Sequence, residues 1–345
     1  MASPHDPSAQ SGGRIPVVAL TGHLGAGKTS LLNHLLRSPG ARLGVVVNDF
    51  GSVSVDAALV TGQVDQAASI SGGCLCCLPG GGGLDKALAR LAQPRLRLDA
   101  ILLEASGAAD PLTLSALIRF SGVGGVRPGG LVEVVDAVEH FETVDTYPEP
   151  PLRYLAASLV VVGKADLLPQ PERSATVARV RQRVHERNPG ALVVEASRGR
   201  VDPALVFDVA STEPPGDRLP LGPRHDDHEP HRHAQAVTQE LSGPVAPGAL
   251  VDLLRQPPPG AYRVKGRVPV LGTAGPQGYL VNVVGRTVHI ASLPEAPDPG
   301  ELVVIGLELD PAQTGLWLHR LVEAPVTGPD PVGLSRLSRL RRLSD

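Results

Sequence analysis

Aromatic and sulfur-containing residues are scarce in this sequence. Phe, Trp and Tyr together make up 3% of the 345 residues, and the chain has three cysteines and one methionine. Because 42% of the residues are hydrophobic, a core can still form, built mainly from Val, Leu, Ala and Ile. Three cysteines cannot form the disulfide framework of a small secreted protein, and the adjacent Cys76 and Cys77 are poorly placed to bond to each other.

A strong net charge and a long apolar segment are also missing. The formal net charge is -3, so no global basic field favours binding to nucleic acid or to an acidic membrane. No apolar run reaches the length of about 18 residues that a membrane-spanning helix needs. Residues 1–14 are polar, lack the pattern of a signal peptide and are expected to form a disordered leader. We therefore expect a cytoplasmic protein whose thiols stay reduced.

Short apolar segments alternate with segments of helical periodicity over the first 210 residues. The predicted strands are 16–20, 43–49, 98–105, 131–137, 159–166 and 191–197, and the predicted helices are 29–37, 84–93, 110–120 and 171–188. Continuous apolar strands that alternate with helices are typical of a mostly parallel sheet covered by helices on both faces. The sequence thus predicts an α/β domain over residues 15–210.

The pattern changes after this domain. Residues 211–235 contain many turn-forming residues and no periodicity, so we interpret them as a linker. Residues 236–325 combine several strand patterns with two helical ones, which predicts a smaller α+β domain. Residues 326–345 form a basic tail in which leucine recurs at every third position. We expect a solvated or frayed terminal helix there, with contact to a membrane or a partner as the alternative.

GHLGAGKT, residues 22–29, follows a predicted strand and precedes a predicted helix. It matches GxxxxGK[ST], the phosphate-binding loop in which backbone N–H groups and a helix N-terminus face the phosphates. Lys28 would bridge the β- and γ-phosphates, and Thr29 would ligate Mg²⁺. The expected nucleotide-binding residues of the loop are Gly22, Gly25, Gly27, Lys28, Thr29 and Ser30.

A second carboxylate near the magnesium is expected at the end of a neighbouring strand. Glu104 follows a run of apolar strand residues and is the favoured candidate, and Asp49, at another strand end, is the alternative. No glutamine or arginine that would speed up hydrolysis is evident, so a slow intrinsic rate is expected. The candidate catalytic residues are therefore Lys28, Thr29 and Glu104.

LVVVGKADLL, residues 159–168, is similar to the N-K-x-D segment with which guanine-binding proteins read their base. Lys164 and Asp166 are present, but Gly163 stands where asparagine is usual. Asp166 can accept hydrogen bonds from both N1–H and the exocyclic amine of guanine. The missing asparagine would weaken the contact with the base, so we expect GTP with reduced affinity and keep ATP or broad nucleotide binding as the alternative.

Four motifs stand in one order along the chain: GHLGAGKT, NDFG, GCLCC and EASGAADP. This order resembles the CobW-type GTPases, P-loop metallochaperones related to the nickel-insertion GTPases of urease and hydrogenase. The likeness runs from about Pro16 to Ala324 and implies a CobW C-terminal domain after the linker. In this resemblance Glu104 matches the Walker-B-like carboxylate, and Asp49 stands where the family usually has glutamate.

The resemblance also implies a transition metal, zinc or cobalt, at Cys74, Cys76 and Cys77, and Asp49 is a further candidate ligand of this metal. Three thiolates within four positions cannot share one face of a regular helix or strand, but a loop can fold them around one ion. Because zinc prefers four ligands, three thiolates leave one position open, which suits a carrier that releases its metal. An inert buried cysteine cluster is the alternative.

HDDHEPHRH, residues 225–233, adds candidate weak metal ligands, His225, His228, His231 and His233, and a solvated charged linker is the alternative interpretation. The sequence as a whole predicts a GTP-hydrolysing metallochaperone that uses GTP, Mg²⁺ and Zn²⁺ or Co²⁺. It would deliver its metal to an apo-metalloprotein client in a nucleotide-dependent way. A nucleotide-dependent metal sensor with no insertion role is the alternative, and a small-molecule kinase is a third candidate.

Overall fold

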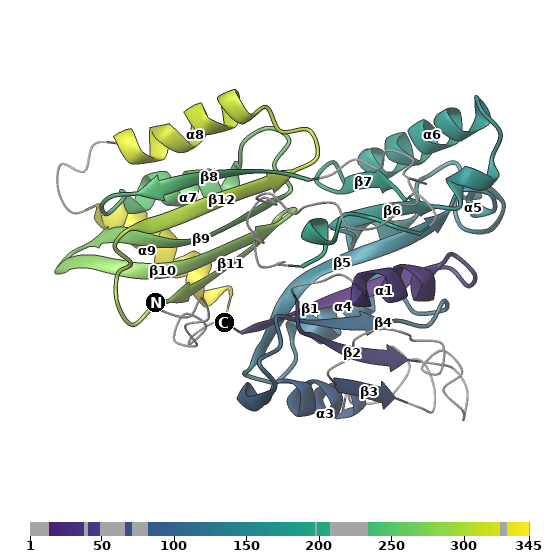
Figure 1. Cartoon of the computed structure of the whole chain (residues 1–345), viewed down its shortest axis with the longest axis horizontal. Helices are drawn as coiled ribbons and strands as arrows, with labels where there is room; N and C mark the ends of the chain where they lie inside the picture. The colour runs from purple at the N-terminus through teal and green to yellow at the C-terminus, as the bar shows by residue number, and fades with distance from the viewer. Residues whose placement is uncertain are drawn as a thin grey trace, which may run out of the picture. The chain divides into compact units, whose positions relative to one another are not determined.

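The computed structural model describes residues 14–37, 41–48, 66–70, 82–196, 199–207, 234–324 and 330–344. The chain divides into two compact units, and the division falls at His233 and Ala234 (Figure 1). The first unit begins at Ile15, and Arg14 belongs to the second unit. Most of the predicted linker, 211–235, lies outside the described residues.

The described part of the first unit contains a sheet of seven strands in the order β3-β2-β4-β1-β5-β6-β7, and neighbouring strands pair in parallel (Figure 1). The strands are β1 (Ile15–Gly22), β2 (Leu43–Asn48), β3 (Gln66–Ile70), β4 (Ala100–Glu104), β5 (Val126–Asp136), β6 (Leu159–Gly163) and β7 (Leu192–Glu195). The helices are α1 (Lys28–Leu36), α3 (Gly82–Leu91), α4 (Pro111–Arg119), α5 (His140–Thr143) and α6 (Glu172–Arg187). Short 3₁₀ turns occur at η2 (Pro94–Leu96), η3 (Leu152–Leu155), η4 (Ala165–Leu167) and η5 (Pro203–Leu205).

The inner strands of this sheet are apolar at successive positions, so both faces of the sheet are buried. Every residue of β4 and β6 is buried, as expected for parallel strands with helices on both sides. Val17 and Ala19 of β1 belong to the core that α3, α4 and α6 complete. The buried leucines of α1 pack on β1 and β4. The predicted α/β fold with a parallel sheet is therefore confirmed.

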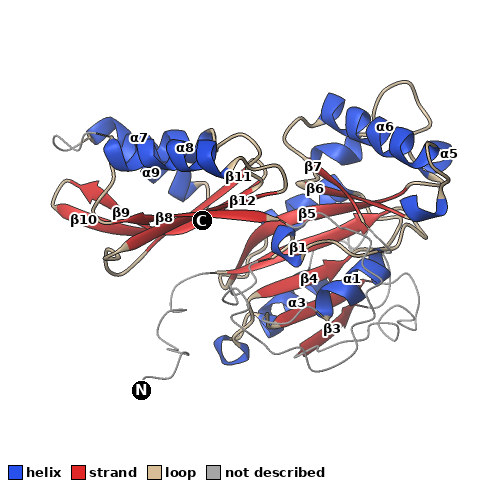
Figure 2. Cartoon of the chain, turned by 45° about the horizontal axis from the view of Figure 1, so that its top comes forward, coloured by secondary structure: helices blue, strands red, loops and turns tan. Residues whose placement is uncertain are grey.

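The second unit has an antiparallel sheet of five strands in the order β11-β10-β9-β12-β8 within its described residues. The strands are β8 (Gln235–Leu241), β9 (Arg263–Gly272), β10 (Gly275–Val284), β11 (Thr287–Ser292) and β12 (Gly300–Gly306). The helices are α7 (Pro247–Arg255), α8 (Pro311–Glu323) and α9 (Pro331–Arg342). All three lie on one side of the sheet (Figure 2), and their leucines form a core with alternate valines of β9 and β10. This is the predicted smaller α+β domain.

The last helix differs from the expectation of a solvated or frayed tail. Leu337 of α9 is fully buried, and the helix packs against α7 and β11. Asp330 caps α9 and also accepts a hydrogen bond from the backbone N–H of Gly248 at 3.1 Å. The backbone N–H of Ile290 donates to Ser344 Oγ at 3.0 Å. The expectation was wrong because the regularly spaced leucines place one apolar face against α7.

None of the helices in the described part of the chain combines the length and the apolar character that crossing a membrane requires.

Candidate nucleotide-binding site

The predicted phosphate loop connects the end of β1 to the start of α1. Gly25 and Gly27 have φ angles of +79° and +100°, a left-handed conformation that glycine adopts at little cost. A Cβ atom at either position would meet nothing within 4 Å, so this side of the loop is open. Gly22 is tightly packed, because a Cβ there would lie 2.4 Å from the carbonyl oxygen of Val134. The open side and the N-terminus of α1 together suit an anion.

Lys28 is buried against the loop that precedes it. Its Nζ donates hydrogen bonds to the carbonyl oxygens of Gly22 at 3.0 Å and His23 at 3.1 Å. These two hydrogen bonds place the ammonium group at the mouth of the loop. Phosphate oxygens carry negative charge and form stronger hydrogen bonds than carbonyl groups, so they can replace these acceptors.

Thr29 and Glu104 lie side by side. Thr29 is in the first turn of α1, and Glu104 ends β4, the strand next to β1. The Thr29 hydroxyl donates to Glu104 Oε1 at 2.6 Å, and Glu104 is 2% exposed. A hydroxyl and a carboxylate are oxygen ligands of the kind that Mg²⁺ prefers. The pair therefore fits the predicted magnesium-binding role.

The segment after β4 approaches the phosphate loop closely. A Cβ atom at Gly107 would lie 2.7 Å from the backbone nitrogen of Leu24 and 2.8 Å from its Cα. Only glycine permits this approach, since real Cβ atoms are not found so close to a backbone nitrogen. The side chain of Leu24 itself is 81% exposed. The short segment 104–107 thus starts at the candidate magnesium ligand and ends in close contact with the backbone of the phosphate loop.

The predicted base-recognition segment follows β6. The strand ends at Gly163, three residues before the predicted end, because Lys164 takes a left-handed conformation with φ +58°. Lys164 Nζ lies 2.6 Å from Asp136 Oδ2 at the end of β5. Asp166 is exposed on η4, where its carboxylate is accessible to a ligand. A Cβ atom at Gly163 would be 3.6 Å from the carbonyl oxygen of Ala26, so this segment adjoins the phosphate loop.

A second segment reaches α1 from the end of β7. A Cβ atom at Gly199 would lie 3.6 Å from Ser30 Cβ. His34 Nε2 donates to the carbonyl oxygen of Val201 at 2.7 Å, which is a packing contact within the unit. The candidate nucleotide residues from β1, β6 and the start of α1 therefore meet at the carboxyl end of the parallel sheet, where ligands of such sheets usually bind.

Two buried polar residues beside the site, Thr21 and Glu133, were missed by the sequence reasoning. Thr21 Oγ1 donates to Glu133 Oε2 at 2.6 Å, and Arg153 Nε lies 2.6 Å from Glu133 Oε1. Burial raises the pKa of Glu133, and the charge of Arg153 opposes this shift. The only signal in the sequence is a glutamate in the middle of the apolar segment LVEVVDA.

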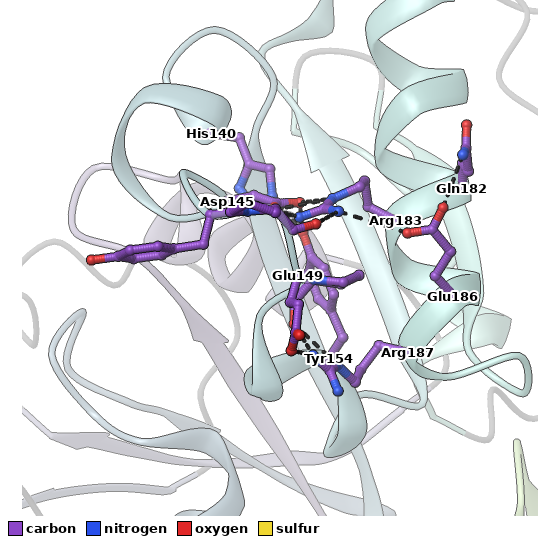
Figure 3. A network of polar contacts seen from close by, with 11 residues as sticks. His140, Asp145, Glu149, Tyr154, Gln182, Arg183, Glu186 and Arg187 are labelled. Atoms are coloured by element: carbon purple, nitrogen blue, oxygen red, sulfur yellow. Dashed lines mark hydrogen bonds and ion pairs between the residues drawn. The ribbon is translucent and has the colours of Figure 1, made fainter.

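A buried network fixes the chain that follows β5 (Figure 3). His140 Nε2 contacts the hydroxyl of Tyr154, which donates to Asp145 Oδ2 at 3.4 Å. Arg183 of α6 donates from Nε to the same Oδ2 at 3.0 Å (Figure 3). Burial lowers the pKa of His140 to about 4 and raises the pKa of Tyr154. The imidazole is therefore neutral at physiological pH, and the network joins residues 140–154 to α6.

The predicted metal ligands lie outside the described residues. These are Asp49, Cys74, Cys76, Cys77, His225, His228, His231 and His233. Among the residues that the structure describes, no group of three or more His, Cys, Asp or Glu side chains could hold a metal ion.

Comparison with known proteins gives matches to both units. Residues 16–195 match the family described as CobW/HypB/UreG, nucleotide-binding domain, and residues 234–320 match the cobalamin synthesis protein cobW C-terminal domain. The chain is 31% identical over 362 residues to the zinc chaperone CobW of Pseudomonas aeruginosa, covering 90% of this chain and 93% of that protein. It is 28% identical to the zinc chaperone CobW of a Sinorhizobium species, with 90% of this chain and 98% of that protein covered.

A solved structure is also similar. The crystal structure of Zn(II)-bound YjiA GTPase from Escherichia coli is 24% identical, with 90% of this chain and 99% of that chain covered and a TM-score of 0.43. The two family matches follow the two units of the structure, and the first contains the phosphate loop, Glu104 and Lys164. Because this match alone spans more than half of the sequence, the chain belongs to the CobW-type family of P-loop GTPases.

Proposed function

We propose that this GTPase is a zinc chaperone that hydrolyses GTP at the phosphate loop and carries zinc on its three cysteines to an apo-metalloprotein client. The observation that carries the nucleotide half is the contact of Thr29 with the buried Glu104 beside the open phosphate loop. The metal half is supported by relatives named zinc chaperones that align over nearly the whole chain.

In the proposed reaction, water attacks the γ-phosphate of GTP and GDP is the leaving group. Lys28 would transfer its hydrogen bonds from the carbonyl groups of the loop to the β- and γ-phosphate oxygens and stabilise the charge that develops there. Thr29 and Glu104 would hold Mg²⁺, which supplies further charge neutralisation. Asp166, which is exposed on η4, would accept hydrogen bonds from the guanine base.

Zinc is the cargo in this proposal, and cobalt is the alternative ion. The proposed ligands are Cys74, Cys76 and Cys77, with Asp49 as a further oxygen ligand. A set of only three thiolates favours release, because a ligand from the client can displace the weaker oxygen ligand from the fourth position. The cysteine segment stands in the sequence between the phosphate loop and Glu104. GTP would tighten the metal site, and hydrolysis would loosen it.

The histidines at 225, 228, 231 and 233 would collect metal weakly, since imidazole and carboxylate groups bind Zn²⁺, Co²⁺ and Ni²⁺. Thiolate ligands need a reducing compartment, so the proposed site of action is the cytoplasm. The proposed partners are GTP, the metal and the client, with neither nucleic acid nor a membrane among them.

Zinc affinity in the two nucleotide states tests this proposal. The affinity is measured anaerobically by chelator competition, first with Mg²⁺ and a non-hydrolysable GTP analogue, then with GDP. We expect tighter binding with the GTP analogue, and loss of that tight binding when Cys76 and Cys77 are both changed to Ser. Equal affinity in the two states would contradict a carrier that GTP controls. Failure to bind either nucleotide would contradict the nucleotide half.

A further inference from the structure

Asp136 connects two strands at the candidate base site. It is the last residue of β5 and is paired in register with Gly163, the last residue of β6. Its Oδ2 lies 2.6 Å from Lys164 Nζ, and its Oδ1 accepts the backbone N–H of Val138 at 3.0 Å. Both carboxylate oxygens are therefore engaged, one by the chain that follows β5 and the other by the lysine of the base-recognition segment.

The carboxylate of Asp136 is held more rigidly than the lysine. On one side it continues the paired strand β5, and shortly after it the chain enters the buried network of His140, Tyr154 and Asp145 (Figure 3). The side chain of Asp136 is 12% exposed, whereas that of Lys164 is 38% exposed. Asp136 is thus the fixed member of the pair, and it determines where the Lys164 side chain lies.

Gly163 provides no side-chain contact of its own. A Cβ atom there would lie 3.6 Å from the carbonyl oxygen of Ala26 and 3.7 Å from that of Val135, both ordinary contact distances. A carboxamide side chain at this position would therefore be within reach of a carbonyl group of the phosphate loop, to which it could donate. Because glycine cannot make that bond, the segment depends more on its other contacts.

The position of Lys164 affects Asp166 through the backbone. Lys164 has a left-handed φ of +58°, a conformation that costs free energy in residues other than glycine. The turn η4 starts from it, and the N–H of Leu167 donates to the Lys164 carbonyl at 3.1 Å. A constraint on Lys164 therefore also constrains the carboxylate that would read guanine.

We propose that Asp136 is a positioning residue for the nucleotide base, and that its ion pair with Lys164 replaces the asparagine contact that Gly163 cannot make. This inference rests on the proposed binding of GTP at the phosphate loop. It assigns the preference for guanine to a residue on β5 that acts through Lys164. Loss of the ion pair should weaken the part of the affinity that depends on the base and leave the part that depends on the phosphates.

The test measures the affinities of the full-length protein for fluorescent GDP and ADP. Asp136→Asn removes the charge and keeps an acceptor for Val138, and we expect GDP affinity to fall roughly tenfold, since hydrogen bonds to charged groups contribute this much. ADP affinity should change little, so the preference for GDP over ADP falls. Gly163→Asn should strengthen GDP binding and restore it in the Asp136→Asn protein.

A matched control is Asp252→Asn, which removes the carboxylate that pairs with Arg336 in the second unit and should leave both affinities unchanged. Unchanged GDP affinity in Asp136→Asn would overturn the inference while leaving the nucleotide site intact. An equal loss of GDP and ADP affinity together with a lower Tm would overturn it in favour of a structural role. Failure of Gly163→Asn to restore binding would overturn the claim that the ion pair replaces an asparagine contact. Absence of GDP binding to the unchanged protein would overturn the proposed function itself.

Discussion

The residues that build the candidate site differ in how visible they are in the sequence. Lys28 and Thr29 belong to a motif whose letters each have a separate physical role, so the sequence identifies them together. Glu104 could be predicted because it ends a strand of apolar residues. Glu133 and Asp136 are single acidic residues of one strand, and their roles depend on partners from other elements, Thr21 and Lys164. No local pattern predicts such a pairing.

Gly107 gives a prediction at the scale of one residue. Changing it to Ala places a Cβ atom 2.7 Å from the Leu24 nitrogen, and backbone atoms cannot move as easily as a side chain can. The segment after β4 must shift away from the phosphate loop, at a cost of about 1–3 kcal/mol as for other overpacked sites. We expect weaker GTP binding and slower hydrolysis, measured by nucleotide titration and phosphate release.

The control for this prediction is Gly122→Ala. A Cβ atom at Gly122 would meet nothing within 4 Å, so the same chemical change there should leave GTP binding and hydrolysis as they were. If Gly107→Ala behaves like Gly122→Ala, the close approach to Leu24 has no role in nucleotide binding.

At the scale of elements, the buried strands were easier to predict than the remaining ones. β4 and β6 are continuous apolar runs, and the sequence located both. β3, with the sequence QAASI, was missed because it has small and polar residues and is defined by its pairing with β2. The first part of β5, VRPGG, was missed because proline and glycine argue against a strand. It pairs with β1 through an irregularity in register between Val17 and Val18.

The network between α5, η3 and α6 predicts that the stability of the protein depends on pH. Burial lowers the pKa of His140 from 6.5 to about 4, so the unfolded chain binds this proton more readily than the folded chain does. The stability contributed by the neutral imidazole is therefore present above about pH 6.5 and is lost as the pH falls toward 4. Between pH 7 and pH 5 the free energy of unfolding should fall by about 2 kcal/mol from this group.

Urea unfolding of the unchanged protein and of His140→Gln at both pH values measures this effect. The variant should be less stable at pH 7 because it loses the contact with Tyr154, but its stability should fall less on acidification. His319→Gln, which changes an exposed histidine of α8, should keep the pH dependence of the unchanged protein. Equal slopes for all three proteins would show that folding does not lower the pKa of His140.

At the scale of the whole molecule, the chain is built as two units with separate cores. The C-terminal family match ends at residue 320, whereas the folded second unit continues through α9 to Ser344. The sequence predicted a basic tail here because arginine is frequent and leucine is spaced regularly. It could not show that α7 and β11 present a surface for those leucines, since that surface forms only in the folded unit.

Leu337 tests whether α9 is an integral part of the second unit. The side chain is fully buried between α9 and the core, so Leu337→Ala should leave a cavity and destabilise this unit by about 2–5 kcal/mol. Leu343→Ala makes the same change at a side chain that is 64% exposed and should have little effect. The readouts are the Tm values of the unfolding transitions and the affinity for GDP. Because the phosphate loop belongs to the other core, GDP affinity should be the same in both variants. A fall in GDP affinity with Leu337→Ala alone would mean that the folding of the second unit controls the nucleotide site, and the two cores could then not be treated as independent.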